Sequence, residues 1–371
     1  MQPVAERGGS DQALLRLVRS LPRDEFDFHI AVPGPSPIAA EFAAAGATLH
    51  IVPMERLSTS HDAGTWARYI GGWPLAVWRL RALVRSLDAD VVHTNSLHSL
   101  YGWAAARLTA RPHVWHAREI VVQSGAALRL ERFLCRRFAT KVVAVSYAVA
   151  AQLDPANVIV LDEHLDPAEF APRNAGAFRD GVGIPDDVPV VGAIGRLDPL
   201  KGFDVLLDAH EQVLATQPDV RLLIVGTPVL GQEEYGRDLA ARCAAADGVL
   251  LLDSRDDIPA VVADLDVLAL PSIEPESYGL VLVEALASGV PVVATDHGGP
   301  PELVARAEPG SGRLVAPGDA AELADAILAL LPPRTSTAAR QRRTRKLTLP
   351  PARFADLFRR VARVARVART A

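Results

Sequence analysis

Residues 270–295 read LPSIEPESYGLVLVEALASGVPVVAT, a stretch that changes its hydrophobic period twice. The pattern predicts the end of a strand, a loop that holds Glu276, and a helix that begins near Gly279 and carries Glu284. The helix is expected to end at Gly289 in a left-handed cap, before a second apolar strand. Strand, helix and strand in this order predict a parallel sheet, in which ligands bind at the carboxyl ends of the strands.

A second stretch, VVGAIGRLDPLKGFDVLLDAH at residues 190–210, predicts another strand and helix with Arg196 and Lys201 between them. Two cations at a strand end would stabilise the negative charge that builds on a departing nucleoside diphosphate. The backbone amides that open the helix of the first stretch can receive an anion in the same way. These amides belong to Ser277, Tyr278, Gly279 and Leu280.

The alternation of short apolar strands with helices runs through the chain twice, which predicts two doubly wound α/β domains. In the first half, strands are predicted at Phe28–Val32, Thr48–Val52, Asp90–His93, His113–His116 and Val142–Val145. In the second half, they are predicted at Val190–Ile194, Arg221–Val225, Val249–Leu252, Val267–Leu270, Val292–Thr295 and Gly312–Val315.

The chain of 371 residues exceeds the length at which a single core usually stops growing, so two domains are expected. We expect an N-terminal domain over residues 1–168, a linker over 169–187 and a C-terminal domain over 188–335. Residues 336–371 would be a basic connection and a final helix that packs back on the N-terminal domain.

The composition argues against several classes of protein. A formal net charge of -5 gives no sign of nucleic-acid binding. No apolar run approaches the roughly 20 residues of a membrane-spanning helix, and no signal peptide is apparent. Cys135 and Cys243 are far apart without metal-ligand spacing, so buried free thiols in a reducing cytoplasm are expected. The basic helix at Leu128–Lys141 could contact anionic lipids at the inner face of a membrane, although a helix docked on the sheet with its arginines in water is favoured.

These motifs resemble those of retaining GT-B glycosyltransferases of group 1, also called family 4. The family pairs two glutamates, with seven residues between them, after Pro-Ser, and adds Gly-Arg-Leu, Lys-Gly and Gly-Gly-x-Pro-Glu motifs. The resemblance covers nearly all of the second half and is looser in the first. The matching residues are Pro271, Ser272, Glu276, Glu284, Gly195, Arg196, Leu197, Lys201, Gly202, Gly298, Gly299 and Glu302, with Gly8, Gly9, Asn95, Ser96 and His116 in the first half.

The resemblance implies a GT-B fold and transfer of a hexosyl group from a nucleotide-diphosphate sugar, with UDP-sugars favoured over GDP-sugars. Glu276 would hold donor-sugar hydroxyls, Glu284 the ribose, and Arg196 and Lys201 the diphosphate. His116 would help to seat the reacting sugar, as would the amides of Gly8 and Gly9, and Asn95 and Ser96 would face the acceptor. The family implies retention of anomeric configuration, no cofactor and no metal.

Two features depart from the family pattern. Only residues 1–7 precede Gly8, where the family has a full apolar strand, so we expect that a first strand is missing from this chain. Glu163 and His164 stand where the family often has Pro-Asn-Gly.

The motif residues also have plainer interpretations. Glu276 and Glu284 could be surface carboxylates, Arg196 and Lys201 could pair with Asp198 and Asp204, and His116 could satisfy a backbone group. A nucleotide-sugar epimerase of the GT-B type and a catalytically silent nucleotide-sugar-binding protein are the alternative functions. The acceptor is open among glycans, lipid-linked sugars and small natural products.

Overall fold

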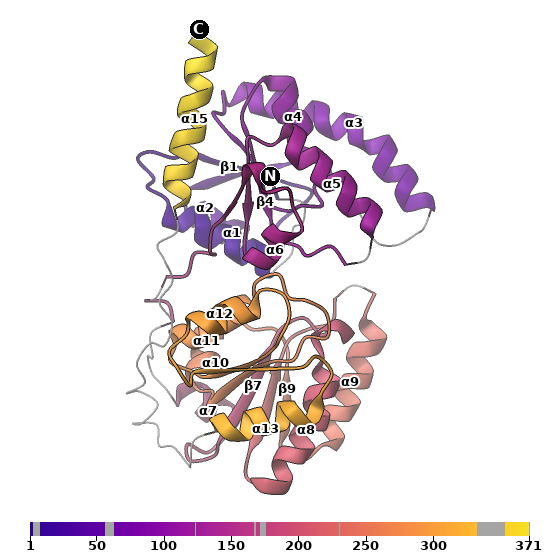
Figure 1. Cartoon of the computed structure of the whole chain (residues 1–371), viewed down its shortest axis with the longest axis vertical. Coiled ribbons are helices and arrows are strands. Elements are labelled where there is room, and N and C mark those ends of the chain that lie inside the picture. Colours follow the sequence, from indigo (N-terminus) through magenta and orange to yellow (C-terminus); the bar gives the residue numbers. More distant parts are fainter. Residues whose placement is uncertain are drawn as a thin grey trace. The chain divides into compact units, whose positions relative to one another are not determined.

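The computed structural model describes residues 1–2, 8–55, 63–122, 124–166, 168–170, 176–229, 231–331 and 353–370. The chain divides into two compact units, which are described separately. Unit 1 comprises Met1–His164 with Pro350–Ala371, and unit 2 comprises Leu165–Leu349. Each unit has the parallel α/β architecture that the sequence predicts (Figure 1).

The described residues of unit 2 form a six-stranded parallel sheet in the order β12-β11-β10-β7-β8-β9. The order reverses at β7, and a doubly wound sheet offers its ligand crevice at such a switch point. Every strand lies where the sequence predicts it, because strands buried on both faces read as continuous apolar runs. The strands are β7 (Val190–Ile194), β8 (Arg221–Val225), β9 (Val249–Leu252), β10 (Val267–Leu270), β11 (Val292–Thr295) and β12 (Gly312–Val315).

Helices cover the sheet of unit 2 in two layers (Figure 1). Side chains of α8, α9 and α13 share one apolar core with β7, β8, β10 and β11. The second layer is made of α7, α10, α11 and α12, which contact one another in succession. The helices are α7 (Ala177–Val182), α8 (Phe203–Thr216), α9 (Glu233–Ala245), α10 (Ile258–Ala263), α11 (Leu280–Ala287), α12 (Pro300–Arg306) and α13 (Ala320–Leu330).

Helix α7 lies in the segment that the sequence suggested was a linker, and it is anchored by a buried arginine. The guanidinium of Arg179 donates to Asp266 Oδ2 at 2.8 Å and to the carbonyl oxygen of Asp264 at 2.9 Å. Asp264 Oδ2 in turn accepts from the amide of Phe178 at 3.1 Å. Both ends of the Arg179–Asp266 ion pair are almost fully buried. The segment therefore belongs to the body of unit 2, a contact that a periodicity argument does not detect.

Unit 1 holds two parallel sheets among its described residues, one of β1 and β2 and one in the order β3-β4-β5-β6. Met1 and Gln2 are hydrogen-bonded to both. The amide of Gln2 donates to the carbonyl oxygen of Ala31 in β1 at 2.9 Å, and the carbonyl of Met1 accepts from Asn95 after β3 at 3.0 Å. Residues 3–7 lie outside the described residues. The strands are β1 (Phe28–Val32), β2 (Ala47–Ile51), β3 (Val92–Thr94), β4 (His113–Ala117), β5 (Lys141–Ala144) and β6 (Val158–Val160).

Helix α3 of unit 1 runs from Ala63 to Ser86 and contains Pro74. A proline favours the first turn of a helix, so a position inside α3 needs support from other contacts. Aromatic contacts stabilise the turn before the proline. The ring of Trp73 packs on the rings of Tyr101 and Trp103, at centroid distances of 6.5 and 6.3 Å. The remaining helices are α1 (Gly9–Ser20), α2 (Ala39–Ala44), α4 (Gly102–Thr109), α5 (Gly125–Phe138), α6 (Tyr147–Ala151) and α15 (Phe354–Thr370).

The C-terminal helix α15 lies on unit 1, whereas the connection expected before it falls outside the described residues (Figure 1). Phe354, Leu357 and Val361 join the apolar core of α1, β1 and β4. Arg359 forms a two-pronged ion pair with Glu25 at 2.7 and 2.8 Å. The helix is therefore part of the domain from which it is most distant in sequence.

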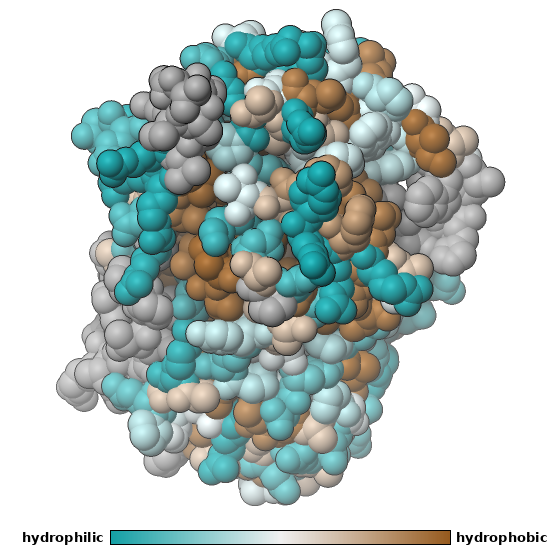
Figure 2. All heavy atoms as spheres, turned by 45° about the horizontal axis from the view of Figure 1, so that its top comes forward, coloured by the Kyte–Doolittle hydropathy of each residue, from teal (hydrophilic) through white to brown (hydrophobic). Residues whose placement is uncertain are grey.

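The surface of unit 1 mixes charged and apolar side chains. Figure 2 shows hydrophobic residues in patches among hydrophilic ones on the face that it brings forward. Large exposed side chains of unit 1 include Ile70, Leu75 and Trp78 on α3 and Phe133 on α5. None of the helices within the described residues is both long and apolar enough to cross a membrane. Both cysteines are buried free thiols, as the sequence predicts.

Candidate active site

Three loops of unit 2 meet at the carboxyl edge of its sheet, after β7, β10 and β11. The loop after β10 is joined to the other two through main-chain bonds. The amide of Ile273 donates to the carbonyl of Leu200 at 2.8 Å, and the amide of Gly299 donates to the carbonyl of Glu276 at 2.7 Å. The ring of His297 bonds to the carbonyl oxygen of Ser272 at 3.1 Å. The motifs that the sequence analysis singled out therefore lie side by side.

Glycines allow these loops to approach so closely. A Cβ atom on Gly202 would lie 2.0 Å from the carbonyl oxygen of Pro271, and Gly202 has a φ of +71°. A Cβ atom on Gly299 would lie 2.6 Å from the carbonyl oxygen of Ser277. Real Cβ atoms do not approach backbone atoms to such distances, so only glycine fits. The Lys-Gly and Gly-Gly motifs are thus explained by contact between main chains.

The carboxylate of Glu276 stands at the centre of this arrangement. Its Oε1 accepts from Ser272 Oγ at 2.6 Å and forms an ion pair with Lys201 Nζ. Burial alone would raise the pKa of Glu276, but Lys201, Ser272 and Arg196 together outweigh it and lower that pKa. Glu276 is therefore an ionised hydrogen-bond acceptor at neutral pH, still 16% exposed.

The two cations differ in their surroundings. Lys201 is largely enclosed and bound to Glu276, whereas Arg196 is exposed. Pairing with nearby aspartates, the plainer interpretation, has no support among the bonds observed. Asp198 accepts from the amide of Leu200 at 2.9 Å, and Asp204 is paired with Arg242. Both cations thus stand at the carboxyl edge with the carboxylate.

Helix α11 begins next to Glu276. Its N-cap is Gly279 with a φ of +96°, and the first amides of a helix have no partner within the helix. Tyr278 is buried, so its side chain belongs to the interior. Glu284 lies on the second turn and is 8% exposed, a placement that excludes a plain surface carboxylate. The helix ends before Gly289, whose φ of +78° is the left-handed conformation that was expected.

In unit 1, the glycine loop leads into α1. Gly8 is the N-cap, and its carbonyl accepts from the amide of Asp11 at 3.1 Å. A Cβ atom on Gly8 would meet nothing within 4 Å, and Gly9 is exposed. Contacts among the described residues therefore do not require a glycine at position 8.

The two residues predicted on the acceptor side lie inside unit 1. Asn95 is fully buried; its Nδ2 donates to Gln2 Oε1 at 2.7 Å, and its Oδ1 accepts from Arg118 Nε at 2.8 Å. Ser96 is nearly as buried and donates to Glu119 Oε1. Both side chains hold the loop after β3 in place rather than lining a surface.

His116 does not lie where the sequence analysis expected it. Its ring is fully buried and packs on His93 and on Phe354 of α15, at centroid distances of 5.5 and 5.3 Å. Burial, with smaller contributions from Arg118 and His93, holds its pKa well below the usual value. β4 runs one residue past His116, so this histidine is a buried, neutral residue within the strand and does not stand at the strand end, where the prediction placed it.

The residues that do follow β4 at the carboxyl edge are Arg118 and Glu119, which the sequence analysis did not select. Arg118 is paired with Glu163, a carboxylate whose pKa burial raises. Glu119 accepts from the amide of Leu97 at 2.8 Å. The sequence could have indicated them, because they are two charged residues directly after an apolar run. Parallel strands present functional groups from this position.

A pocket of about 380 Å³ opens in unit 1 beyond the carboxyl ends of β1 and β2. Arg68 and Arg79 of α3 contribute cationic side chains to its lining, and Glu55 contributes a carboxylate. Its remaining lining residues are Pro33, Pro53, Met54, Gly72, Leu75 and Ala76. The pocket therefore lies at the edge where parallel sheets of this kind bind ligands.

Comparison with known proteins gives the family. Residues 188–332 match the family model described as glycosyl transferases group 1, and residues 8–161 match the glycosyl transferase 4-like domain. The chain is 32% identical over 312 residues to a D-inositol 3-phosphate glycosyltransferase of Stackebrandtia nassauensis, covering 76% of this chain and 69% of that protein. The two matched regions fall in unit 2 and unit 1, so both units belong to the glycosyltransferase class. The chain is a member of the glycosyltransferase group 1 family.

Further similarities agree with this class. A lipopolysaccharide core mannosyltransferase of Rhizobium meliloti, LpsB, is 32% identical over 212 residues, 56% of this chain and 60% of that protein. Among solved structures, Anabaena HepE in complex with UDP-glucose superposes with a TM-score of 0.75 at 23% identity, over 99% of this chain and 97% of that one. This likeness shows that the two-domain α/β fold is that of GT-B glycosyltransferases.

Proposed function

We propose that this protein transfers a hexosyl group from a nucleotide-diphosphate sugar to a hydroxyl of its acceptor, with retention of the anomeric configuration. The observation that carries the proposal is the ionised Glu276, held by Lys201 and Ser272 beside the first turn of α11. A carboxylate accepts hydrogen bonds from sugar hydroxyls, and a bond to a charged acceptor is of the stronger kind. The same edge supplies cations for the diphosphate.

Each group would have a separate task. Arg196 and Lys201 would stabilise the charge that develops on the diphosphate as the bond to the anomeric carbon breaks. The amides of residues 277–280 would add a helix N-terminus to that field. Glu284, one turn further along α11, would accept from the ribose hydroxyls. Gly8 and Gly9 would approach the donor from unit 1.

Retention follows from the family resemblance. The acceptor hydroxyl would attack on the face from which the diphosphate departs, and an oxygen of that diphosphate would take the hydroxyl proton. Following the anomeric proton of the product by NMR tests this assignment, because a product of inverted configuration would contradict it. A nucleotide-sugar epimerase would instead give free sugar or an epimer, and a silent binding protein would give no product.

For the donor we propose a UDP-sugar, because the UDP-glucose complex of HepE shares this fold. For the acceptor, the pocket with Arg68 and Arg79 suits a phosphorylated polyol. The relatives named D-inositol 3-phosphate glycosyltransferases make D-inositol 3-phosphate the first acceptor to test. Greater transfer to D-inositol 3-phosphate than to inositol would support the role of the arginines. Equal transfer would contradict it.

The test of the donor site is thermal-shift binding with UDP-, GDP- and TDP-sugars. One donor should stabilise the wild type, and Glu276→Gln and Arg196→Ala should weaken that stabilisation. The matched controls are Glu211→Gln, exposed on α8, and Arg221→Ala, at the amino end of β8, both away from the site. Stabilisation that is equally strong in all four variants would contradict the donor site. The absence of stabilisation by any donor would contradict the function.

Peripheral contact with an anionic membrane is a second proposal, carried by the apolar side chains that α5 exposes. Leu130 and Phe133 are 49% and 60% exposed beside Arg129, Arg132 and Arg136. An amphipathic helix with this composition can lie on an anionic surface. Sedimentation with phosphatidylglycerol vesicles should remove the protein from solution, and Phe133→Ser should reduce this. No difference between phosphatidylglycerol and phosphatidylcholine vesicles would reject the contact.

A further inference from the structure

The ring of His297 joins the loop after β11 to the loop after β10. Its Nε2 lies 3.1 Å from the carbonyl oxygen of Ser272. A carbonyl oxygen only accepts, so Nε2 carries the hydrogen of this bond. The backbone of the histidine is held as well, because its amide donates to the carbonyl oxygen of Thr295 at 2.9 Å. Both the ring and the main chain of His297 are therefore fixed at the carboxyl edge of the sheet of unit 2.

Two separate connections tie His297 to Glu276. Ser272, whose carbonyl oxygen accepts from the ring, also donates through its Oγ to Glu276 Oε1 at 2.6 Å. Gly298, the residue after the histidine, forms a β-bridge with Glu276. The imidazole thus belongs to the same small cluster as the carboxylate on which the proposed function rests.

This cluster presents two hydrogen-bond acceptors that remain open. Glu276 Oε1 is occupied by Lys201 and Ser272, but Oε2 has no hydrogen-bond partner among the described residues. The same is true of His297 Nδ1, which carries a lone pair in the neutral ring because the hydrogen is on Nε2. Neither atom is among the buried unpartnered polar atoms of the described residues, whereas both ring nitrogens of His116 are. Oε2 and Nδ1 are therefore accessible acceptors.

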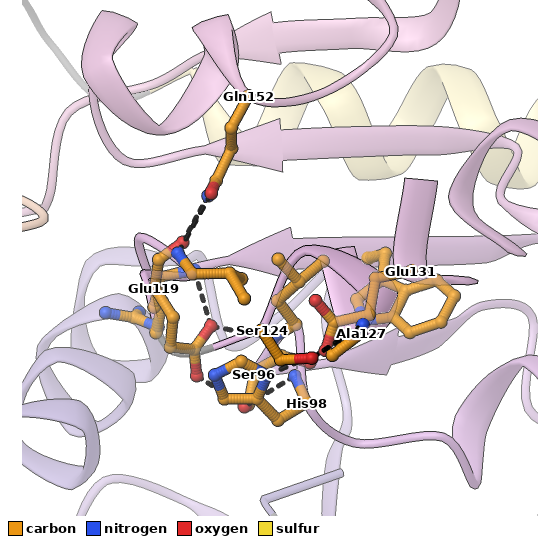
Figure 3. A network of polar contacts seen from close by, with 11 residues as sticks. Ser96, His98, Glu119, Ser124, Ala127, Glu131 and Gln152 are labelled. Atoms are coloured by element: carbon orange, nitrogen blue, oxygen red, sulfur yellow. Dashed lines mark hydrogen bonds and ion pairs between the residues drawn. The ribbon is translucent and has the colours of Figure 1, made fainter. Parts of the chain in front are cut away.

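The carboxylates around the loop after β3 in unit 1 differ, because other groups of the protein take up their oxygens (Figure 3). Glu119 Oε1 accepts from Ser96, and Glu119 Oε2 accepts from the amide of Leu97 at 2.8 Å. Glu131 is 4% exposed, and its Oε1 lies 2.7 Å from His98 Nδ1. These carboxylates hold a loop in place, which is a different use of a carboxylate from that in unit 2.

We propose that His297 is a specificity-determining residue of the donor site: its Nδ1 accepts from one hydroxyl of the donor sugar while Glu276 Oε2 accepts from another. This inference rests on the proposed function and narrows its substrate class to a hexose with free hydroxyl groups at the two positions that these atoms contact. A site that accepts from a hydroxyl rejects an analogue without it, because the acceptor is then left unpaired. No bond of the imidazole is made or broken.

The test compares the affinity for a nucleotide sugar with the affinity for its own nucleoside diphosphate. UDP-glucose, UDP-galactose, GDP-mannose, UDP and GDP are titrated into the full chain in a calorimeter. His297→Gln keeps a donor in the place of Nε2 but has no acceptor in the place of Nδ1, and His297→Asn has the reverse. His297→Gln should bind the nucleotide sugar about five- to tenfold more weakly, the effect of one lost hydrogen bond, and the diphosphate normally. His297→Asn should keep most of the affinity for the sugar.

This order of affinities separates recognition of the sugar from a merely structural role. If His297 only tied the two loops together, His297→Gln would bind the nucleotide sugar normally and His297→Asn would be the weaker variant. The matched control is His210→Gln, because His210 Nε2 lies 3.1 Å from the carbonyl oxygen of Asp247, a residue that precedes β9 at the amino edge of the sheet. The control should bind nucleotide sugars as the wild type does.

Donor analogues identify the hydroxyl that His297 contacts. Each analogue has one hydroxyl of the tightest-binding nucleotide sugar replaced by fluorine, which cannot donate a hydrogen bond. One analogue should bind the wild type about five- to tenfold more weakly than the parent sugar, yet bind His297→Gln almost as the parent does. If every analogue weakens the wild type and His297→Gln by the same factor, the proposed contact is overturned.

The remaining outcomes decide between the two proposals. Equal affinity of His297→Gln and the wild type for the nucleotide sugar would overturn the inference and leave the proposed function standing. Equal weakening of the nucleotide sugar and its diphosphate in His297→Gln would also overturn the inference. A wild type that binds a nucleotide sugar but releases no diphosphate from it would overturn the proposed function, while the affinities would still decide the role of His297. A wild type that binds none of the nucleotide sugars would overturn both.

Discussion

Gly298 lies so close to Glu276 that a Cβ atom at position 298 would stand 2.1 Å from the carbonyl oxygen of Glu276. The two residues also form an isolated parallel β-bridge. The loop after β11 thus rests directly on the backbone that carries the central carboxylate of the site. The position of Glu276 depends on its neighbours after β11 as well as on its own loop.

Gly298→Ala should therefore displace Glu276 and weaken donor binding. The variant adds a backbone clash to the cost of a φ of +76°, so we expect a loss of about 2 to 4 kcal/mol of stability. Gly310→Ala is the control, because Gly310 has a similar φ of +81° but nothing within 4 Å of its Cβ position. Chemical denaturation and donor titration of both variants measure the difference. Equal losses would show that the contact with Glu276 is unimportant.

Lys201→Met should destabilise the protein in a pH-dependent way. The pKa of Glu276 is lowered on folding, so its ionised form contributes stability above the unfolded pKa of about 4.5, which is lost as the pH falls through the folded pKa. Without Lys201 this contribution disappears, at a cost of about 2 kcal/mol at pH 7. The difference from the wild type should shrink at pH 4. Urea unfolding at both pH values measures the free energies of unfolding, and Arg221→Met is the control. If Lys201→Met differs from the wild type by the same amount at pH 7 and pH 4, this account is contradicted.

Arg179→Met should be among the most damaging substitutions in unit 2. It leaves the buried carboxylate of Asp266 without its cation and removes the donor to the main-chain carbonyl of Asp264, and a loss of about 3 to 5 kcal/mol is typical when a buried pair loses one partner. Arg255→Met removes the partner of Asp257 on the surface and should cost less than about 1 kcal/mol. Thermal unfolding of the two variants side by side makes the comparison. Similar melting temperatures would refute the role assigned to the buried pair.

Glu119→Ala should loosen the loop after β3 without unfolding unit 1. The variant removes three hydrogen bonds to one carboxylate, and the amide of Leu97 loses its acceptor. Hydrogen exchange at residues 96–98 should accelerate by tenfold or more, as expected for about 1.4 kcal/mol or more of lost local stability. Glu211→Ala serves as the exposed control. Unchanged exchange at Leu97 would show that the carboxylate does not hold the loop.

The sequence predicted the strands of unit 2 at their observed ends because each is a short apolar run bounded by turn residues. It missed β6 (Val158–Val160), which is only partly buried, and α7, whose attachment is a buried ion network. A helix that is attached through buried polar groups need not show a periodic pattern of hydrophobic residues in its sequence. The C-terminal helix α15 belongs to unit 1, the domain on which the sequence analysis expected it to pack.

The site of unit 2 was predictable because its residues cluster in three short motifs, each at a strand end. Unit 1 was harder. His116 was selected by residue type, but position along β4 decides exposure, and the strand continues to Ala117. Arg118 and Glu119 stand at the edge instead. His98 and Glu131 are 33 residues apart, and only the packing of α5 against the loop after β3 brings them together.

The glycine contacts at Gly202, Gly298 and Gly299 mean that main chain, rather than side chains, sets the outline of the proposed donor site. An enzyme built in this way can change its substrate through side chains alone, while the frame stays constant. A designer who wishes to alter donor choice should therefore vary exposed positions such as Arg196 and leave the three glycines untouched. In such a design, the shape of the proposed site and its choice of sugar are encoded in different atoms.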